Sequence, residues 1–149
     1  MRFWDSSAIV PLLVDEASSA WARSLLDSDD EVLAWWAARI ECVSAIARRE
    51  RDDELAPGDV SVAMRELDAM ASAWTEVAPS DTVRAQARRL LRVHPLRAGD
   101  ALQLAAALIA AEGHPPTLPL VSLDERLAIA AEREGLPVVR HVEALPDPR

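Results

Sequence analysis

The amino-acid sequence predicts an α/β fold of three layers, in which helices cover both faces of a central, mainly parallel sheet of five strands. Short apolar segments alternate along the chain with segments of helical periodicity, as in a series of β-α units. Segments such as LPLVSL are almost entirely apolar, which is typical of strands buried on both faces of a parallel sheet. The 149 residues, 50% of them hydrophobic, fit a single domain over 1–149 with a sizeable core.

The chain is predicted to start with a strand, RFW, that ends near Asp5 and leads into a helix with Ser6 or Ser7 as its N-cap. Apolar residues at helical spacing predict a second helix over 17–26, and the run EVLAWW predicts the second strand. Asp5 is therefore expected at the carboxyl end of a strand.

The next two helices are predicted to be amphipathic. The helix over 38–50 contains Glu41, and the spacing of its apolar residues predicts a single buried stripe. The members of this stripe are Trp36, Ile40, Val43 and Ala47. A further amphipathic helix is predicted over 59–70, followed by a third strand over 74–77.

The second half of the chain is predicted to contain three helices and two strands. Ser80-Asp81 opens the first helix, and the nearly all-apolar segment 101–111 predicts a buried helix that Asp100 precedes. LPLVSL is the fourth strand, and the helix DERLAIAAERE follows it until Gly135. PVVRHV is expected to form the last strand.

The charge and the missing residue types exclude several classes of protein. The formal net charge is −9, so binding of nucleic acid has to be local, whereas a basic partner would suit the surface. All 16 basic residues are arginines, and the absence of lysine excludes the phosphotransfer chemistry of receiver domains. The chain has no GxxxxGK[ST] phosphate loop, and its single cysteine, Cys42, excludes an intramolecular disulfide. No apolar run is long enough to span a membrane, and a cytoplasmic protein is expected.

Four acidic residues lie where apolar segments begin, end or are interrupted, namely Asp5, Glu41, Asp100 and Asp124. Ligands of open parallel sheets bind outside the carboxyl ends of the strands, so these side chains could converge there. Carboxylate oxygens suit Mg²⁺, or Mn²⁺ as the alternative, because both ions prefer oxygen ligands. The pattern therefore predicts a hard-metal site.

Each of these acids also has a structural interpretation. Asp100 and Asp124 could cap the helices that follow them, and Asp5 could be a turn residue. Glu41 could be neutralised by an arginine of its own helix, such as Arg48. The residues alone leave both interpretations open.

The order of these segments resembles that of the PIN-domain ribonucleases, in particular the VapC toxins of bacterial VapBC toxin–antitoxin modules. The resemblance covers nearly the whole chain and rests on DSSAIV, RIECVSAIARRE, LRAGDALQLAAAL and LVSLDERL. In that family an aspartate ends the first strand, a glutamate lies in the third helix, and two further aspartates begin the later segments. The residues that match are Asp5, Glu41, Asp100 and Asp124, with the hydroxyl groups of Ser6 or Ser7 and Ser122 beside them.

The resemblance implies a metal-dependent endoribonuclease that cleaves RNA with a metal-activated water. The three aspartates are then expected to hold Mg²⁺ directly or through water, and Glu41 to complete the site or accept a proton. Ser6 and Ser122 are expected to support the acids. Arg97 and Arg126, close in sequence to Asp100 and Asp124, could hold the scissile phosphate or steady a carboxylate.

The same resemblance implies a homodimer and a cognate antitoxin that lies over the active site. Two alternatives keep the fold, namely a non-catalytic PIN-like binding module and a DNA-directed nuclease. Trp21 and Trp36 fit core stripes of their helices, whereas at least one of the five tryptophans is expected to be exposed.

Overall fold

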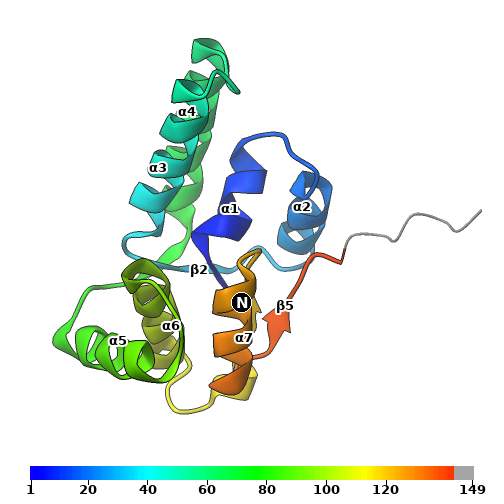
Figure 1. The fold of residues 1–149 in the computed structure, drawn as a ribbon. Coiled ribbons are helices and arrows are strands. Elements are labelled where there is room, and N and C mark those ends of the chain that lie inside the picture. The colour runs from blue at the N-terminus through cyan, green and yellow to red at the C-terminus, as the bar shows by residue number, and fades with distance from the viewer. Residues whose placement is uncertain (143–149) are drawn as a thin grey trace, which may run out of the picture.

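A computed structural model describes residues 1–142, so residues 143–149 of the predicted single domain lie outside the described part of the chain. The described residues form one sheet of five parallel strands between two layers of helices (Figure 1). The predicted three-layer α/β architecture is confirmed. No helix within 1–142 combines the length and the apolar character that crossing a membrane requires.

The strand at the N-terminus lies at the centre of the sheet. Its neighbours are the second strand on one side and the fourth on the other, in the order β3-β2-β1-β4-β5. Trp4 is in register with Val121, so the residues that follow them, Asp5 and Ser122, leave the sheet side by side. The strands are β1 Arg2–Trp4, β2 Val32–Trp35, β3 Thr75–Val77, β4 Leu120–Val121 and β5 Val138–Val139.

The two faces of the sheet are covered by different parts of the chain. Phe3 and Trp4 are both fully buried, and since successive strand residues point to opposite faces, they belong to two separate cores. The core around Trp4 is covered by α1 Ser6–Leu13, α2 Ser19–Ser28, α3 Ala38–Arg51 and α4 Pro57–Ala73. The core around Phe3 is covered by α5 Asp81–Val93, α6 Ala98–Ala110 and α7 Glu125–Arg133. In Figure 1 the paired helices α3 and α4 extend away from the sheet on one side, and α5, α6 and α7 lie on the other.

The predicted buried stripe of α3 is wrong at two of its four residues, whereas Val43 packs against the core around Trp4. Ile40 is 68% exposed and Trp36, just before the helix, is 57% exposed. The helix instead buries Ala38, Cys42 and Ile46 against α1 and α4. Ala38 and Cys42 are small, which allows the start of α3 to approach α1 closely. The larger Trp36 and Ile40 remain on the surface.

The other helices differ from prediction mainly at their ends. The helix predicted over 101–111 is α6, which begins three residues earlier, at Ala98. Asp100 therefore lies in its first turn, and Arg97 is at the N-cap position. Asp5, and neither of the serines that follow it, caps α1 through its side chain. Gly135 ends α7 as predicted, and its φ of +92° is a conformation that favours glycine.

Replacing Leu104 with alanine is expected to lower the free energy of unfolding by about 3 kcal/mol. Leu104 of α6 is fully buried in the core around Phe3, so the shorter side chain would leave a cavity. Urea denaturation of the two proteins measures the difference. The matched control is Leu91→Ala, because Leu91 is 43% exposed and its truncation should change stability by less than about 1 kcal/mol.

Candidate active site

Asp5 is a buried carboxylate at the carboxyl end of the central strand. Its backbone N–H donates to Val121 O at 3.0 Å, which continues the pairing of β1 with β4 by one residue. Its side chain accepts a hydrogen bond from the Ser7 backbone N–H at 3.3 Å and so caps α1. Only 3% of the residue is exposed, so the position is fixed by both the sheet and the helix.

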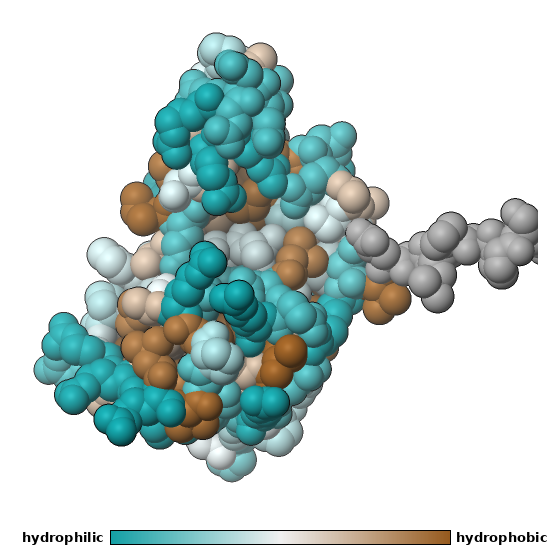
Figure 2. All heavy atoms as spheres, in the orientation of Figure 1, coloured by the Kyte–Doolittle hydropathy of each residue, from teal (hydrophilic) through white to brown (hydrophobic). Residues whose placement is uncertain are grey.

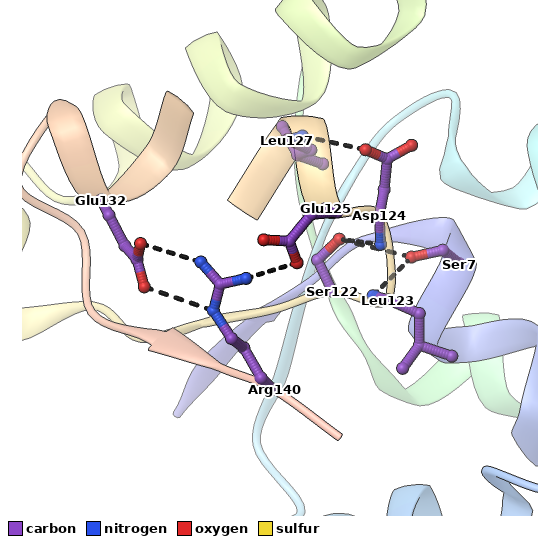
Figure 3. A network of polar contacts seen from close by, with 8 residues as sticks. All are labelled: Ser7, Ser122, Leu123, Asp124, Glu125, Leu127, Glu132 and Arg140. Atoms are coloured by element: carbon purple, nitrogen blue, oxygen red, sulfur yellow. Dashed lines mark hydrogen bonds and ion pairs between the residues drawn. The ribbon is translucent and has the colours of Figure 1, made fainter. Parts of the chain in front are cut away.

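Two serine hydroxyls hold the Asp5 carboxylate. Ser122 Oγ donates to Asp5 Oδ2 at 3.0 Å, and Ser7 Oγ donates to the same oxygen. Each hydroxyl also accepts a backbone N–H from the loop after β4, Ser7 Oγ from Leu123 at 2.9 Å and Ser122 Oγ from Asp124 at 3.0 Å (Figure 3). The start of α1 and the start of α7 are thereby joined through one buried carboxylate.

Ser122 therefore hydrogen-bonds to Asp5, as the sequence predicts. The serine of α1 that hydrogen-bonds to the same oxygen is Ser7. The hydroxyl of Ser6 donates to the other oxygen, Asp5 Oδ1, at 3.5 Å, and its effect on Glu41 opposes the rise in the pKa of that residue. The sequence predicts Ser6 for the role of Ser7, and the difference arises because adjacent residues in the first turn of a helix differ only in direction.

Glu41 reaches the site from the first turn of α3 and is held by Gln103. Gln103 Nε2 donates to Glu41 Oε2 at 2.7 Å, and the glutamine is 1% exposed, with no hydrogen-bond partner for its Oε1 within residues 1–142. The sequence analysis missed Gln103. Its signal was a polar residue inside the otherwise apolar run LQLAAAL, where a buried amide requires a partner.

Asp100 and Asp124 lie at the N-terminal ends of two helices, where backbone N–H groups favour negative charge. Asp124 Oδ1 accepts the Leu127 N–H at 2.9 Å, so its predicted role as the N-cap of α7 is confirmed (Figure 3). The N-cap interpretation of Asp100 is wrong, since it lies in the first turn of α6. Its carboxylate is therefore available to the site.

All four acids line one open pocket of about 400 Å³. Arg97 lines it as well, as the sequence analysis expected for a residue near the substrate, whereas Arg126 lies close enough to Asp100 to lower its pKa but outside this lining. The remaining lining residues are Ser6, Ser7, Val10, Ser44, Ala45 and Arg48. Ser44 and Arg48 were not predicted as lining residues, although both lie on the same side of α3 as Glu41.

Three carboxylates of this pocket, those of Asp5, Glu41 and Asp100, have raised pKa values. Burial raises the pKa of Asp5 to about 6, hydrogen bonds from Ser7 and Ser122 oppose the rise, and the charge of Glu41 adds to it. Burial also raises the pKa of Glu41. The pKa of Asp100 is raised by burial and by the charge of Asp124, and lowered by Arg97. The crowding of negative charge is thus unfavourable unless a cation compensates it.

The donor chemistry of the pocket fits a hard divalent cation, because the groups that line it are carboxylate and hydroxyl oxygens. Within residues 1–142, no three acidic, histidine or cysteine side chains are close enough together to form a complete ion site. The fit is therefore one of donor type and charge.

Comparison with known proteins identifies the family. The PIN domain matches residues 2–133. Two proteins of Mycobacterium tuberculosis, Ribonuclease VapC45 and Ribonuclease VapC49, are each 33% identical over 133 residues, which cover 89% of this chain and 90% of theirs. A toxin–antitoxin complex from Klebsiella pneumoniae contains a chain of similar fold, with a TM-score of 0.62, 15% identity, and coverage of 93% of this chain and 96% of that one. The chain therefore belongs to the PIN-domain family, as a member of the VapC type.

Proposed function

We propose that this protein is the toxin of a type II toxin–antitoxin module, a divalent-metal-dependent endoribonuclease that cleaves RNA with an activated water. The observation that carries the proposal is the pocket that four carboxylates from separate segments line at the carboxyl edge of the sheet. The relatives named Ribonuclease VapC support RNA as the substrate. The proposed catalytic domain is a single one that spans residues 1–149.

Each acid has a proposed role. Asp5, Asp100 and Asp124 hold Mg²⁺, or Mn²⁺ in its place, directly or through water, and Glu41 completes the site or accepts a proton. A cation held there supplies charge neutralisation for the phosphodiester and activation of the attacking water. Ser122 orients Asp5 by hydrogen bonding to Oδ2, whereas Oδ1 accepts only the longer contact from Ser6 among residues 1–142.

The arginines beside the acids are proposed to position the substrate. Arg97 and Arg48 line the same pocket, and neither forms an ion pair with a carboxylate of residues 1–142. A guanidinium group can hold a phosphate through two parallel hydrogen bonds. These side chains therefore offer local positive charge to RNA in a chain whose formal net charge is −9.

The proposed partners are a cognate antitoxin and a second copy of the chain. The similar fold seen in a toxin–antitoxin complex supports the antitoxin. The exposed Trp36 and Ile40 offer apolar surface for a protein contact. An antitoxin that covers the acidic pocket would block entry of RNA.

The proposed function is tested by incubating the purified protein with RNA and with single-stranded DNA, in Mg²⁺, in Mn²⁺ and in chelator. We expect internal cleavage of RNA in the presence of metal, and 5′-end sequencing would identify the sites. Cleavage of DNA alone would instead support the DNA-directed alternative. Binding of RNA without cleavage under all metal conditions would support the non-catalytic alternative.

Replacing Gln103 with leucine is expected to lower the affinity for Mn²⁺ by about tenfold. The glutamine N–H stabilises the charged form of Glu41, so its loss makes a proton compete better with the metal. Calorimetric titration with Mn²⁺ measures the affinity. Gln86→Leu on α5, a glutamine that only accepts from the exposed Arg89, is the control and should bind Mn²⁺ as the wild type does. Equal affinities for all three proteins would contradict the role of Gln103.

A further inference from the structure

A second, smaller pocket of about 210 Å³ lies between α7 and the connection from α5 to α6. Apolar atoms form nearly all of its lining, and Ile129 is 40% exposed there. Its lining residues are His94, Pro95, Arg126, Ile129, Ala130 and Arg133. Figure 2 shows apolar side chains gathered over this helix layer with hydrophilic side chains beside them. The pocket is distinct from the acidic one.

The part of α7 that borders this pocket is apolar in the middle and positive at both ends. Ile129 and Ala130 lie three and four residues after Arg126, and four and three residues before Arg133, so the four residues share a face of the helix. The two arginines are about 10.5 Å apart along the helix axis, at about 1.5 Å per residue. A ligand with an apolar body between two negative groups would fit this face.

Neither arginine is neutralised by the acids of its own helix. Glu125 and Glu132 of α7 are both bound to Arg140, which approaches from β5 (Figure 3). Within residues 1–142, neither Arg126 nor Arg133 forms an ion pair with a carboxylate. Both guanidinium groups are therefore available to an anion in a protein that is acidic overall.

His94 lines the pocket with the carbon atoms of its ring, since almost no polar surface faces the pocket and its Nδ1 is buried. It is 6% exposed, and its Nε2 is 2.6 Å from Glu134 Oε1, a carboxylate that Arg89 also binds. Because a carboxylate accepts, Nε2 donates to Glu134. Nδ1 has no hydrogen-bond partner among the described residues. The ring therefore offers apolar surface to the pocket.

The N-terminal end of α7 connects the two pockets, since its N-cap Asp124 lines the acidic pocket and Arg126 lines the second one. Arg126 lies two residues after Asp124, and its charge acts on Asp100. A polymer that enters the acidic pocket can therefore continue along α7 towards Arg133.

We propose that this second pocket binds one unstacked nucleobase of a single-stranded RNA, while Arg126 and Arg133 contact the phosphates on either side of it. The inference rests on the proposed ribonuclease function. Single-stranded RNA is recognised through bases that leave the stack, pack against side chains and arginine planes, and hydrogen-bond at their edges. Ile129, Pro95 and the ring of His94 provide the apolar surface on which the base packs. The base so held neighbours the nucleotide that is cleaved.

The test measures binding of a short, labelled single-stranded RNA to the full chain by fluorescence anisotropy, in chelator and over a series of salt concentrations. Arg126→Gln combined with Arg133→Gln should weaken binding by at least about tenfold, and the slope of log affinity against log salt should become shallower by about 1.4 for two lost phosphate contacts. Ile129→Ser should weaken binding by about fivefold without changing the slope, because it removes only apolar surface beside the base. An abasic oligonucleotide should not distinguish Ile129→Ser from the wild type.

The matched control is Arg23→Gln combined with Arg65→Gln, two exposed arginines of the opposite helix layer, which removes the same charge and should bind RNA as the wild type does. Wild-type affinity and slope in the Arg126 and Arg133 variant would overturn the proposal, as would failure of the wild type to bind RNA. A variant that binds RNA normally but self-associates less would assign the pocket to a protein side chain and also overturn it. Wild-type binding that depends on these arginines, without cleavage in metal, would refute the ribonuclease function and leave the base pocket standing.

Discussion

Replacing Asp5 with asparagine is expected to slow metal-dependent RNA cleavage by at least about a thousandfold, since a catalytic cation contributes several kcal/mol to transition-state stabilisation. Asparagine has nearly the shape of aspartate, and its single side-chain oxygen can still accept from Ser7 and Ser122. The amide group then replaces the oxygen nearest Ser6 and removes the negative charge. The substitution therefore affects cation binding much more than folding.

Two measurements separate loss of function from loss of structure. Cleavage of labelled RNA at saturating Mg²⁺ gives the rate, and thermal unfolding in chelator gives the stability, which should be equal to or above that of the wild type. Asp27→Asn, an exposed change on α2, is the control and should leave both values unchanged. If the Asp5→Asn variant folds and cleaves RNA at the wild-type rate, Asp5 is not part of the active site.

Most of the fold was predictable because its signals are local. The five strands and the helices that follow them appear as changes of hydrophobic period along the chain, and the parallel sheet follows from their alternation. The stripe of α3 was not predictable, because two faces of that helix carry apolar residues. Only the packing of Ala38 and Cys42 against neighbouring helices decides that Trp36 and Ile40 are exposed.

The acids of the candidate site were predictable for a related reason. Asp5 and Asp124 end strands or begin helices, and strand ends of a parallel sheet meet at one edge, so sequence order determines much of their proximity. Gln103 and Ser7 act through side-chain directions that depend on how α6 and α1 pack. The second pocket was not predictable at all, since it joins His94 to a face of α7 that has no local sign of a ligand.

The free energy of unfolding of the metal-free protein is expected to decrease as the pH rises from about 4 to about 7, by about 3 kcal/mol from Asp5 alone. The pKa of Asp5 is raised from 3.8 to about 6 in the folded protein, chiefly by burial. Between these values the folded state binds more protons than the unfolded state, so stability is highest below the lower pKa and is lost as the pH rises through the upper one. The raised pKa values of Glu41 and Asp100 act in the same direction.

Addition of Mn²⁺ should reverse this dependence. The cation binds the ionised acids of the folded state, so it stabilises most at pH 7 and least near pH 4, where protons occupy the same oxygens. Urea denaturation across this pH range, in chelator and in Mn²⁺, measures both curves. Asp5→Asn should flatten the metal-free curve, because the residue that titrates is gone, and should lose most of the stabilisation by Mn²⁺. If Mn²⁺ does not change the stability of the wild-type protein at pH 7, the four carboxylates do not form a metal site. An ion that binds the folded state has to raise the free energy of unfolding.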